Sequence, residues 1–419
     1  MIHLSEKDRA LLEGDRGPAA RMAMSILVRM AGVLGARQML DITRAHIDAT
    51  IYIGDAGLEF AERLASLGGR VAVPSTVNVS GVDEHHWKEW PVPADWAEKA
   101  HRQMVAYQKM GTIPIWTCAP YQTEHAPKSG EQIAWGESNA IVFANSVLGA
   151  RTERYPDYLD IAAAIAGRVP AVGLHLEENR GGQLVLDLRS IPESIAARDD
   201  FYPVLGHFVG KTAGDRIPVL AHLEARPSTD QLKALGAAAA STGSVALFHI
   251  VGVTPEAPTL EAALRGRWPE QTVEVGLADL KAARRELETA TGEDLDLVVL
   301  GSPHFSFDEM RRLAPLLEGR ERHPRVTFLV TTSRITRDLA AGAGLLQTLE
   351  AFGGRITVDT CILATPMLPK TVRRLMTNSG KYALYSPGLL GIEVAYGSLE
   401  DCVSSAVAGK VVREPSPWD

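Results

Sequence analysis

The chain contains only three cysteines in 419 residues, few aromatic side chains (6%) and no excess of positive charge. So few cysteines, in an odd number, argue against the disulfide framework of a secreted domain. The formal net charge of −8 offers no attraction for nucleic acid or an anionic membrane. No apolar run approaches the roughly 20 residues of a membrane span, and the polar N-terminus lacks the apolar core of a signal peptide. We therefore expect a cytoplasmic protein without nucleic-acid or membrane partners.

What the chain does contain is the composition of a globular protein with a large core: 46% hydrophobic and 22% charged residues. From about residue 160, apolar β-rich runs alternate with amphipathic helical segments, which predicts α/β lobes with mainly parallel sheets in three α/β/α layers. The predicted strands are 171–174, 217–222, 245–251, 295–300, 326–330 and 356–363. The predicted helices between them are 229–240, 277–289, 307–317 and 336–352.

The N-terminal third is predicted to be mixed. Ser5 can cap the first of two helices within 5–34, and the second is an apolar helix over 19–32. The segment 57–67 also has helical spacing, and 71–74 has the pattern of a buried strand. The loop at 75–83 is rich in small polar side chains and follows that strand, where α/β proteins commonly bind ligands. We expect a lobe boundary near residue 155, giving lobes 1–155 and 156–419.

Several familiar motifs fail on inspection. The segment Gly206–Thr212 resembles a phosphate-binding loop, but only three residues separate its glycines, and it precedes a predicted strand where such a loop would follow one. The pair His85–His86 lacks the ligand spacing of a zinc site. The turn at 301–304 lacks the nucleophile elbow of a hydrolase.

A dense polar segment follows Cys118 and includes a predicted helix at 137–148. Glu137, Ser138 and Asn145 lie there among small apolar residues, so they are expected to be buried. Buried polar groups cost free energy unless they are paired or bind a ligand. A polar network holding the helix would satisfy them, but for Glu137 and Ser138 we favour ligand contact.

Taken together, these features resemble the aconitase X family over almost the whole chain. The segments that carry the resemblance are His46-Ile47-Asp48, Thr117-Cys118-Ala119-Pro120-Tyr121, Trp135-Gly136-Glu137-Ser138, residues 144–152, Asp359-Thr360-Cys361 and residues 377–382. The resemblance implies aconitase-like three-layer lobes and an iron–sulfur hydro-lyase activity.

The resemblance also implies the metal ligands. Cys118 and Cys361 fall on cluster-ligand positions, whereas the third ligand of archaeal relatives lies in a Gly-Cys-Pro-His turn that reads Gly301-Ser302-Pro303-His304 here. Cys402, Ser302 or a non-protein ligand could complete the set, on a [2Fe–2S] cluster, a [4Fe–4S] cluster or a single iron. The acidic neighbours of Cys402 should raise the pKa of its thiol, which weakens it as a ligand.

Substrate contacts implied by the resemblance fall on Thr50, Asn78, Glu137, Ser138 and Lys381. Ser75, together with Asn78, could orient the substrate as a neutral hydrogen-bond partner. Lys381 could pair with the substrate carboxylate or with enolate-like charge, or could simply be a surface charge. Glu137 could be the general acid for the departing hydroxyl, or could position residues beside the iron.

For the substrate we expect cis-3-hydroxy-L-proline, giving Δ1-pyrroline-2-carboxylate. Only Lys128, Arg151 and Lys381 are candidate cations for a phosphate, which disfavours (R)-5-phosphomevalonate. Another small hydroxy acid stays open. So does a degenerate, non-catalytic binding or regulatory subunit, because Ser302 replaces a ligand cysteine.

The base of the reaction is expected outside this chain. Superfamily members place a catalytic serine on a swivelling domain, and the chain ends at residue 419 without room for one. We therefore expect a large catalytic subunit that forms a heterodimer with a small swivel-domain subunit carrying that serine.

Overall fold

A computed structural model describes residues 2–415. Met1 and residues 416–419, to which our expectations about the chain ends extend, lie outside the described residues. The chain divides into two compact units. Unit 1 is Met1–Arg180 with Ala364–Pro366, and unit 2 is Gly181–Leu363 with Met367–Asp419.

The sheet of unit 1 is parallel, with β2 (Arg44–Ile47) between β3 (Ser75–Val77) and β4 (Ile133–Trp135). Ile47 pairs with Val77 and His46 with Trp135. The register therefore brings the residues that follow the three strands to one edge of the sheet. The predicted strand at 71–74 is wrong, because the amides of Val71 and Ala72 bind the carbonyls of Met110 and Ala164 outside any sheet.

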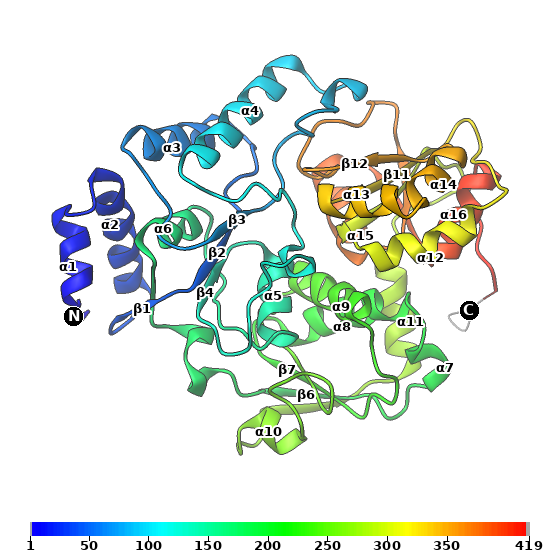
Figure 1. Cartoon of the computed structure of the whole chain (residues 1–419). Helices are drawn as coiled ribbons and strands as arrows, with labels where there is room; N and C mark the ends of the chain where they lie inside the picture. The colour runs from blue at the N-terminus through cyan, green and yellow to red at the C-terminus, as the bar shows by residue number, and fades with distance from the viewer. Residues whose placement is uncertain (1, 416–419) are drawn as a thin grey trace. The chain divides into compact units, whose positions relative to one another are not determined.

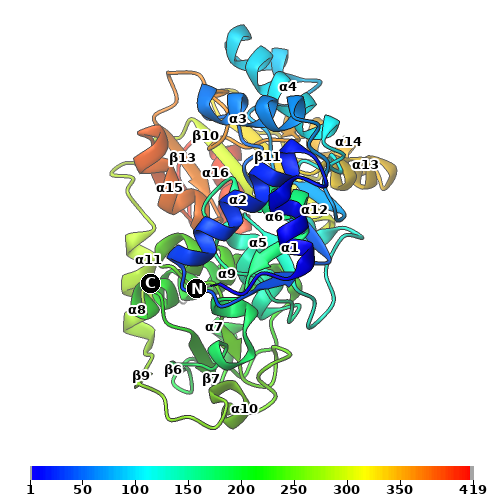
Figure 2. The same ribbon diagram turned by 90° about the vertical axis from the view of Figure 1, so that its left-hand side faces the viewer.

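Helices and a small antiparallel sheet complete unit 1. Ser5 caps α1 (Glu6–Glu13) as predicted, through a capping box. The helices α2 (Pro18–Val33) and α6 (Leu159–Ala166) are far apart in sequence and pack side by side (Figure 2). The other elements are α3 (Asp55–Ser66), α4 (Ala94–Lys109), α5 (Ser138–Ser146), the antiparallel pair β1 (Met39–Asp41) and β5 (Arg168–Pro170), and 3₁₀ turns at Trp87–Glu89, Pro120–Gln122, Gly173–His175 and Glu177–Asn179. The predicted strand at 171–174 is wrong, since it overlaps the turn at Gly173–His175.

The first sheet of unit 2 is parallel, in the order β8-β7-β6-β9. Its strands are β6 (Leu184–Asp187), β7 (Pro218–Ala221), β8 (His249–Ile250) and β9 (Gln271–Glu274). Its helices are α7 (Glu193–Ala196), α8 (Phe201–Ala213), α9 (Thr229–Thr242), α10 (Leu260–Leu264) and α11 (Leu277–Glu286). The predictions at 217–222, 229–240 and 277–289 are confirmed, whereas only two residues of 245–251 form a strand.

The segment Gly206–Thr212 lies inside α8, which excludes a phosphate-binding loop. A β-carbon on Gly206 would lie 2.3 Å from the carbonyl oxygen of Leu235, and one on Gly210 would lie 2.5 Å from that of Ala239. The two glycines therefore let α8 pack directly on the backbone of α9.

The second sheet of unit 2 is also parallel, in the order β12-β11-β10-β13-β14. Its edge strand β12 lies beside β11 (Figure 1). Its strands are β10 (Leu297–Phe305), β11 (Thr327–Thr332), β12 (Arg355–Thr357), β13 (Arg374–Thr377) and β14 (Glu393–Tyr396). Its helices are α12 (Phe307–Leu317), α13 (Arg334–Gly342), α14 (Leu345–Ala351), α15 (Gly380–Leu390) and α16 (Leu399–Ala408). The chain winds from β10 towards β12 and then from β13 towards β14. Since such crossovers are right-handed, α12 and α15 cover opposite faces.

Sequence predictions in this sheet have mixed outcomes. The strands at 295–300 and 326–330 and the helix at 307–317 are confirmed. The helix at 336–352 is broken into α13 and α14 at Gly344, whose φ is +79°. The strand at 356–363 ends at Thr357.

The α/β class with mainly parallel sheets is confirmed, since three of the four sheets are parallel throughout residues 2–415. No helix in this described range is long and apolar enough to cross a membrane.

Candidate functional site

Three polar residues meet at the carboxyl edge of the sheet in unit 1: Asp48 after β2, Asn78 after β3 and Glu137 after β4. Carboxyl edges of parallel sheets are where α/β proteins bind ligands, particularly where the chain crosses from one side of a strand to the other. Here β2 is that strand, because β3 and β4 flank it. The side-chain amide of Asn78 donates to Asp48 Oδ1, and Asn78 is only 1% exposed.

Other side chains at this edge hold the backbone. The hydroxyl of Thr50 lies 3.2 Å from the carbonyls of Ile47, Asn78 and Val79, which joins the two loops. The hydroxyl of Ser75 donates to the carbonyl of Val73 (2.8 Å). Both side chains are buried, so the structure places these two predicted contact residues in the frame of the site.

Asp160 is part of this edge and was missed by sequence reasoning. Its Oδ2 accepts from the amides of Asp48 (2.5 Å) and Ala49 (3.2 Å), and its Oδ1 accepts from that of Ile161 (2.6 Å). Burial raises the pKa of Asp160 to about 6, against the lowering effect of these amides. The sequence did contain a signal for this role, since Asp160 is the one charged residue in the apolar segment that forms α6. A carboxylate buried there needs a specific hydrogen-bond or ionic partner.

Glu137 is the N-cap of α5, and its side chain accepts from the amide of Ala140 (2.8 Å). It also accepts from the side chains of Asn139 and Ser138. The amide group of Asn139 in turn donates to the carbonyl of Cys118 (3.0 Å). Glu137 therefore connects the start of α5 to the cysteine loop, while Ser138 remains partly exposed.

The loop that carries Cys118 is held from a second side by His46. His46 is fully buried, its Nδ1 lies 2.8 Å from Thr76 Oγ1, and its ring also meets the backbone of Thr117. Burial lowers the pKa of His46 to about 3, so the ring is neutral at physiological pH. The neutral ring of His46 therefore links the sheet to the loop that carries Cys118.

Cys118 and Cys361 lie in loops of the same design. A non-glycine residue with left-handed backbone comes first (Trp116, φ +41°; Asp359, φ +64°), then a buried threonine, then a partly exposed cysteine. Such backbone costs about 1–3 kcal/mol and persists only where the surroundings impose it. Arg334 does so for Asp359, with two contacts of 2.7 and 2.6 Å to its carboxylate.

Cys402 has a different environment. It is fully buried in α16 within an apolar cluster that includes Val298, Leu300 and Val403. Burial raises the pKa of its thiol well above the usual range, and Asp401 and Glu400 add to the effect. A protonated thiol in an apolar core is a poor metal ligand.

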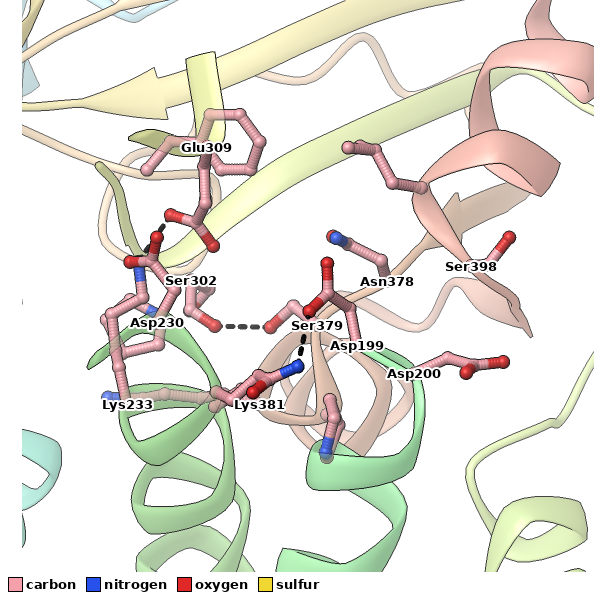
Figure 3. A pocket seen from close by; sticks show the side chains of 18 of the residues that line it. Asp199, Asp200, Asp230, Lys233, Ser302, Glu309, Asn378, Ser379, Lys381 and Ser398 are labelled. Atoms are coloured by element: carbon pink, nitrogen blue, oxygen red, sulfur yellow. Dashed lines mark hydrogen bonds and ion pairs between the residues drawn. The ribbon is translucent and has the colours of Figure 1, made fainter. Parts of the chain in front are cut away.

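A pocket in unit 2 lies at the point where the order of the second sheet reverses, between the ends of β10 and β13. Ser302 comes from β10 and Lys381 from the first turn of α15. Ser379, the N-cap of α15, donates its hydroxyl to the carbonyl of Ser302, so the two segments are joined directly (Figure 3). The structure thus brings together Ser302 and Lys381, two predicted site residues that are 79 positions apart in the sequence. Both are partly exposed.

One wall of the pocket is a buried ionic cluster that the sequence did not reveal. Lys233, on α9, lies 3.1 Å from Asp230 and also pairs with Glu309 on α12 (Figure 3). Burial alone would lower the pKa of Lys233, but these two carboxylates outweigh it and raise the pKa. Lys233 also reaches the carbonyl of His304 (3.5 Å), which supports the segment that carries Ser302.

Within residues 2–415, no group of three His, Cys, Asp or Glu side chains is arranged to hold a metal ion. The chemistry of the donors nevertheless fits iron, because Cys118 and Cys361 form no disulfide, are partly exposed and carry the thiols that iron accepts as ligands.

Polar residues at the carboxyl edges of parallel sheets, together with partly exposed thiols on strained loops, are typical of α/β proteins that bind a ligand there. The chain belongs to the aconitase X family, whose first, second and third domains match residues 1–178, 182–285 and 295–408.

Similar proteins carry dehydratase names. The chain is 49% identical to a cis-3-hydroxy-L-proline dehydratase of Pseudomonas aeruginosa, over 98% of this chain and 71% of the relative. It is 39% identical to a phosphomevalonate dehydratase large subunit of Methanothermobacter thermautotrophicus, over 94% and 96% of the two chains. The crystal structure of Thermococcus kodakaraensis aconitase X (holo-form) superposes with a TM-score of 0.87 at 34% identity, covering 97% of this chain and 100% of that one. The chain is therefore an enzyme of the hydro-lyase class.

Proposed function

We propose that this chain is the large catalytic subunit of an iron-dependent hydro-lyase that converts cis-3-hydroxy-L-proline to Δ1-pyrroline-2-carboxylate. The observation that carries the proposal is the identity of 49% and 48% with two relatives named for that reaction, against 34–39% with relatives named for phosphomevalonate.

The pocket of unit 2 supports the same choice. A phosphate needs cations that are not already neutralised. Lys233 is paired with two carboxylates, and Arg312, which also lines the pocket, is paired with Asp199 and Asp230. Arg151, in unit 1, is paired with Glu177. These pairs favour a substrate with one carboxylate over (R)-5-phosphomevalonate.

In this proposal, Cys118 and Cys361 hold the iron, whether as a [2Fe–2S] cluster, a [4Fe–4S] cluster or a single ion. Bound iron would supply a Lewis acid for the substrate hydroxyl. Ser302 replaces the third thiol as a ligand or leaves that position to a non-protein ligand, and Cys402 is a core residue.

Lys381 pairs with the substrate carboxylate, and Ser138 and Asn78 orient the substrate. Thr50 and Ser75 act only through the backbone they hold. Glu137 positions the Cys118 loop.

The substrate is tested with anaerobically reconstituted large and small subunits together. We expect turnover of cis-3-hydroxy-L-proline and none of (R)-5-phosphomevalonate, measured by product formation. Turnover of phosphomevalonate alone would replace the proposed substrate. Iron-loaded protein that is inert towards all small hydroxy acids would favour the degenerate, non-catalytic subunit.

The ligands are tested by iron and sulfide content after anaerobic reconstitution. Cys118→Ala and Cys361→Ala should each lose most of the iron. Cys402→Ala is the matched control: it should keep the iron and lose only stability, by about 1–2 kcal/mol, because it opens a small cavity. The amounts of iron and of sulfide bound per chain in the wild type identify the cluster type. Iron lost only in the Cys402 variant would reverse the assignment.

A further inference from the structure

We propose that Asp48 is a further catalytic residue, the acid that protonates the departing hydroxyl of the substrate. The inference rests on the proposed dehydratase function and moves the acid role from Glu137 to its neighbour at the same sheet edge.

Position is the first argument. Asp48 directly follows the central strand β2, and the register sets it level with Asn78 on one side and Glu137 on the other. It is partly exposed, whereas Glu137 and Asp160 are 4% and 0% exposed. Among the three carboxylates, Asp48 is the one that a substrate can reach.

Hydrogen bonding is the second argument. Glu137 and Asp160 both accept hydrogen bonds from backbone amides, so each already has a structural role. Glu137 caps α5, and Asp160 fixes the turn at Asp48–Ala49. Asp48 accepts from Asn78 through Oδ1 alone, and its Oδ2 has no hydrogen-bond partner within residues 2–415. One oxygen is thereby held in place, and the other is left to carry a proton.

An orphaned atom beside Asp48 points independently to a ligand. Asn78 Oδ1 is buried and has no partner among the described residues. Buried carbonyl oxygens are rarely left unpaired, because each one costs free energy. A substrate ammonium or hydroxyl would supply the missing donor next to Asp48.

The surroundings of Asp48 keep it protonated. Although the residue is partly exposed, protein surrounds its carboxyl group, and this loss of solvation raises the pKa of Asp48 well above the usual range. The negative charges of Glu137, Asp157 and Asp160 raise it further, and the hydrogen bond from Asn78 opposes the shift. Glu137 lies at the start of α5, Asp157 before α6, Asp160 within α6, and Asn78 after β3. Tyr107 on α4 and Tyr158 before α6 also face this cluster, and burial raises the pKa of both, so they stay neutral.

The proposed step is balanced. The base removes the proton from C2, and the electron pair of the broken C2–H bond forms the C2=C3 double bond while the C3–O bond breaks. The proton of Asp48 Oδ2 passes to the departing oxygen, so water leaves and Asp48 becomes a carboxylate. Solvent then restores its proton, and the enamine product tautomerises to the imine.

The first test uses a leaving group that needs no proton. In the reconstituted complex, Asp48→Asn should lower kcat for cis-3-hydroxy-L-proline by about 100- to 10,000-fold with little change in KM. With cis-3-chloro-L-proline, which releases chloride, the same variant should stay within a few-fold of the wild type. Glu137→Gln is the matched control and should lose activity equally on both compounds. Equal losses for Asp48→Asn would reduce Asp48 to a structural role.

The second test uses Asp157→Asn, which removes a negative charge that raises the pKa of Asp48. Activity requires the protonated acid, so it falls as pH rises through that pKa. The variant should shift this basic limb to lower pH and leave the plateau rate unchanged. An unshifted limb would contradict the proposal.

A third readout does not depend on the substrate. The infrared band of a protonated carboxyl should be present at neutral pH in the wild-type complex and absent in Asp48→Asn. A missing band in the wild type would overturn the proposal. A wild-type complex that shows the band but dehydrates neither compound would instead refute the proposed function.

Discussion

Asp48, Glu137 and Asp160 are three carboxylates at one edge of a sheet, and each has a different set of partners. Glu137 caps a helix, Asp160 accepts from three amides, and Asp48 keeps one oxygen unbonded. Residue type and motif predicted that Glu137 matters. They could not assign its role, because that depends on which amides point at which oxygen. Partners, rather than identity, separate the structural acids from the reactive one.

Asp160 should leave a signature in the pH dependence of stability. Its pKa is raised to about 6, so the folded state binds more protons than the unfolded state between about pH 4 and 6. Its contribution is therefore full below its unfolded pKa and is lost as pH rises through 6, by up to about 3 kcal/mol.

Asp160→Asn removes this dependence. The free energy of unfolding of wild type minus variant, from urea titrations, should fall between pH 4 and 7. A difference that is flat or rises with pH would show that Asp160 is stabilised as an anion.

At the level of elements, helices with clear ends were predictable, whereas several short strands were not. The helix at 307–317 was predicted to the residue, because Ser306 and Glu309 form a capping box ahead of a periodic apolar face. The strands β13 and β14 have four residues each and leave no periodic signal, yet β13 leads directly to Lys381. Site residues could thus be named from motifs, while the register that brings them together could not.

The packing of α8 on α9 gives a prediction at this level. Gly206→Ala should destabilise the protein by about 2–4 kcal/mol, because the new methyl group meets the carbonyl of Leu235 and the helices must separate. Gly388→Ala, in α15, meets nothing within 4 Å and should stabilise by about 0.5–1 kcal/mol.

Urea unfolding of the two variants gives the comparison directly. Equal effects on stability would mean that close approach of the helices is not what requires glycine at position 206.

For the whole molecule, the sequence was enough to place the chain in its family and class. Motifs from residue 46 to residue 382 carried that assignment, and the matches to three domains bear it out. The burial of Cys402 in an apolar core was not predictable from the sequence. The acidic residues Glu400 and Asp401 precede it in the first turn of α16, although Cys402 lies on the face of that helix that packs into the core. Lobe limits and the ligand set remain proposals for the same reason: they depend on packing.

The partner is a prediction at this scale. We expect the large chain alone, loaded with iron, to have no more than a trace of dehydratase activity. Adding the small subunit in equal amount should restore it, because that subunit would supply the base. Relatives named large subunits, which match this chain over 96–100% of their length, support the expectation.

Activity measured against the molar ratio of the two polypeptides should saturate near one to one. Full activity of the large chain by itself would contradict the division of labour.

The two glycines of α8 have a consequence for how mutational data on this protein should be interpreted. In a library selected only for folded protein, positions 206 and 210 should return glycine almost alone, although neither touches the chemistry. Because a lysine and a threonine follow, such a pattern of retained glycines would be mistaken for a nucleotide-binding motif. The glycines would in fact be retained because α8 and α9 pack too closely for a side chain at either position.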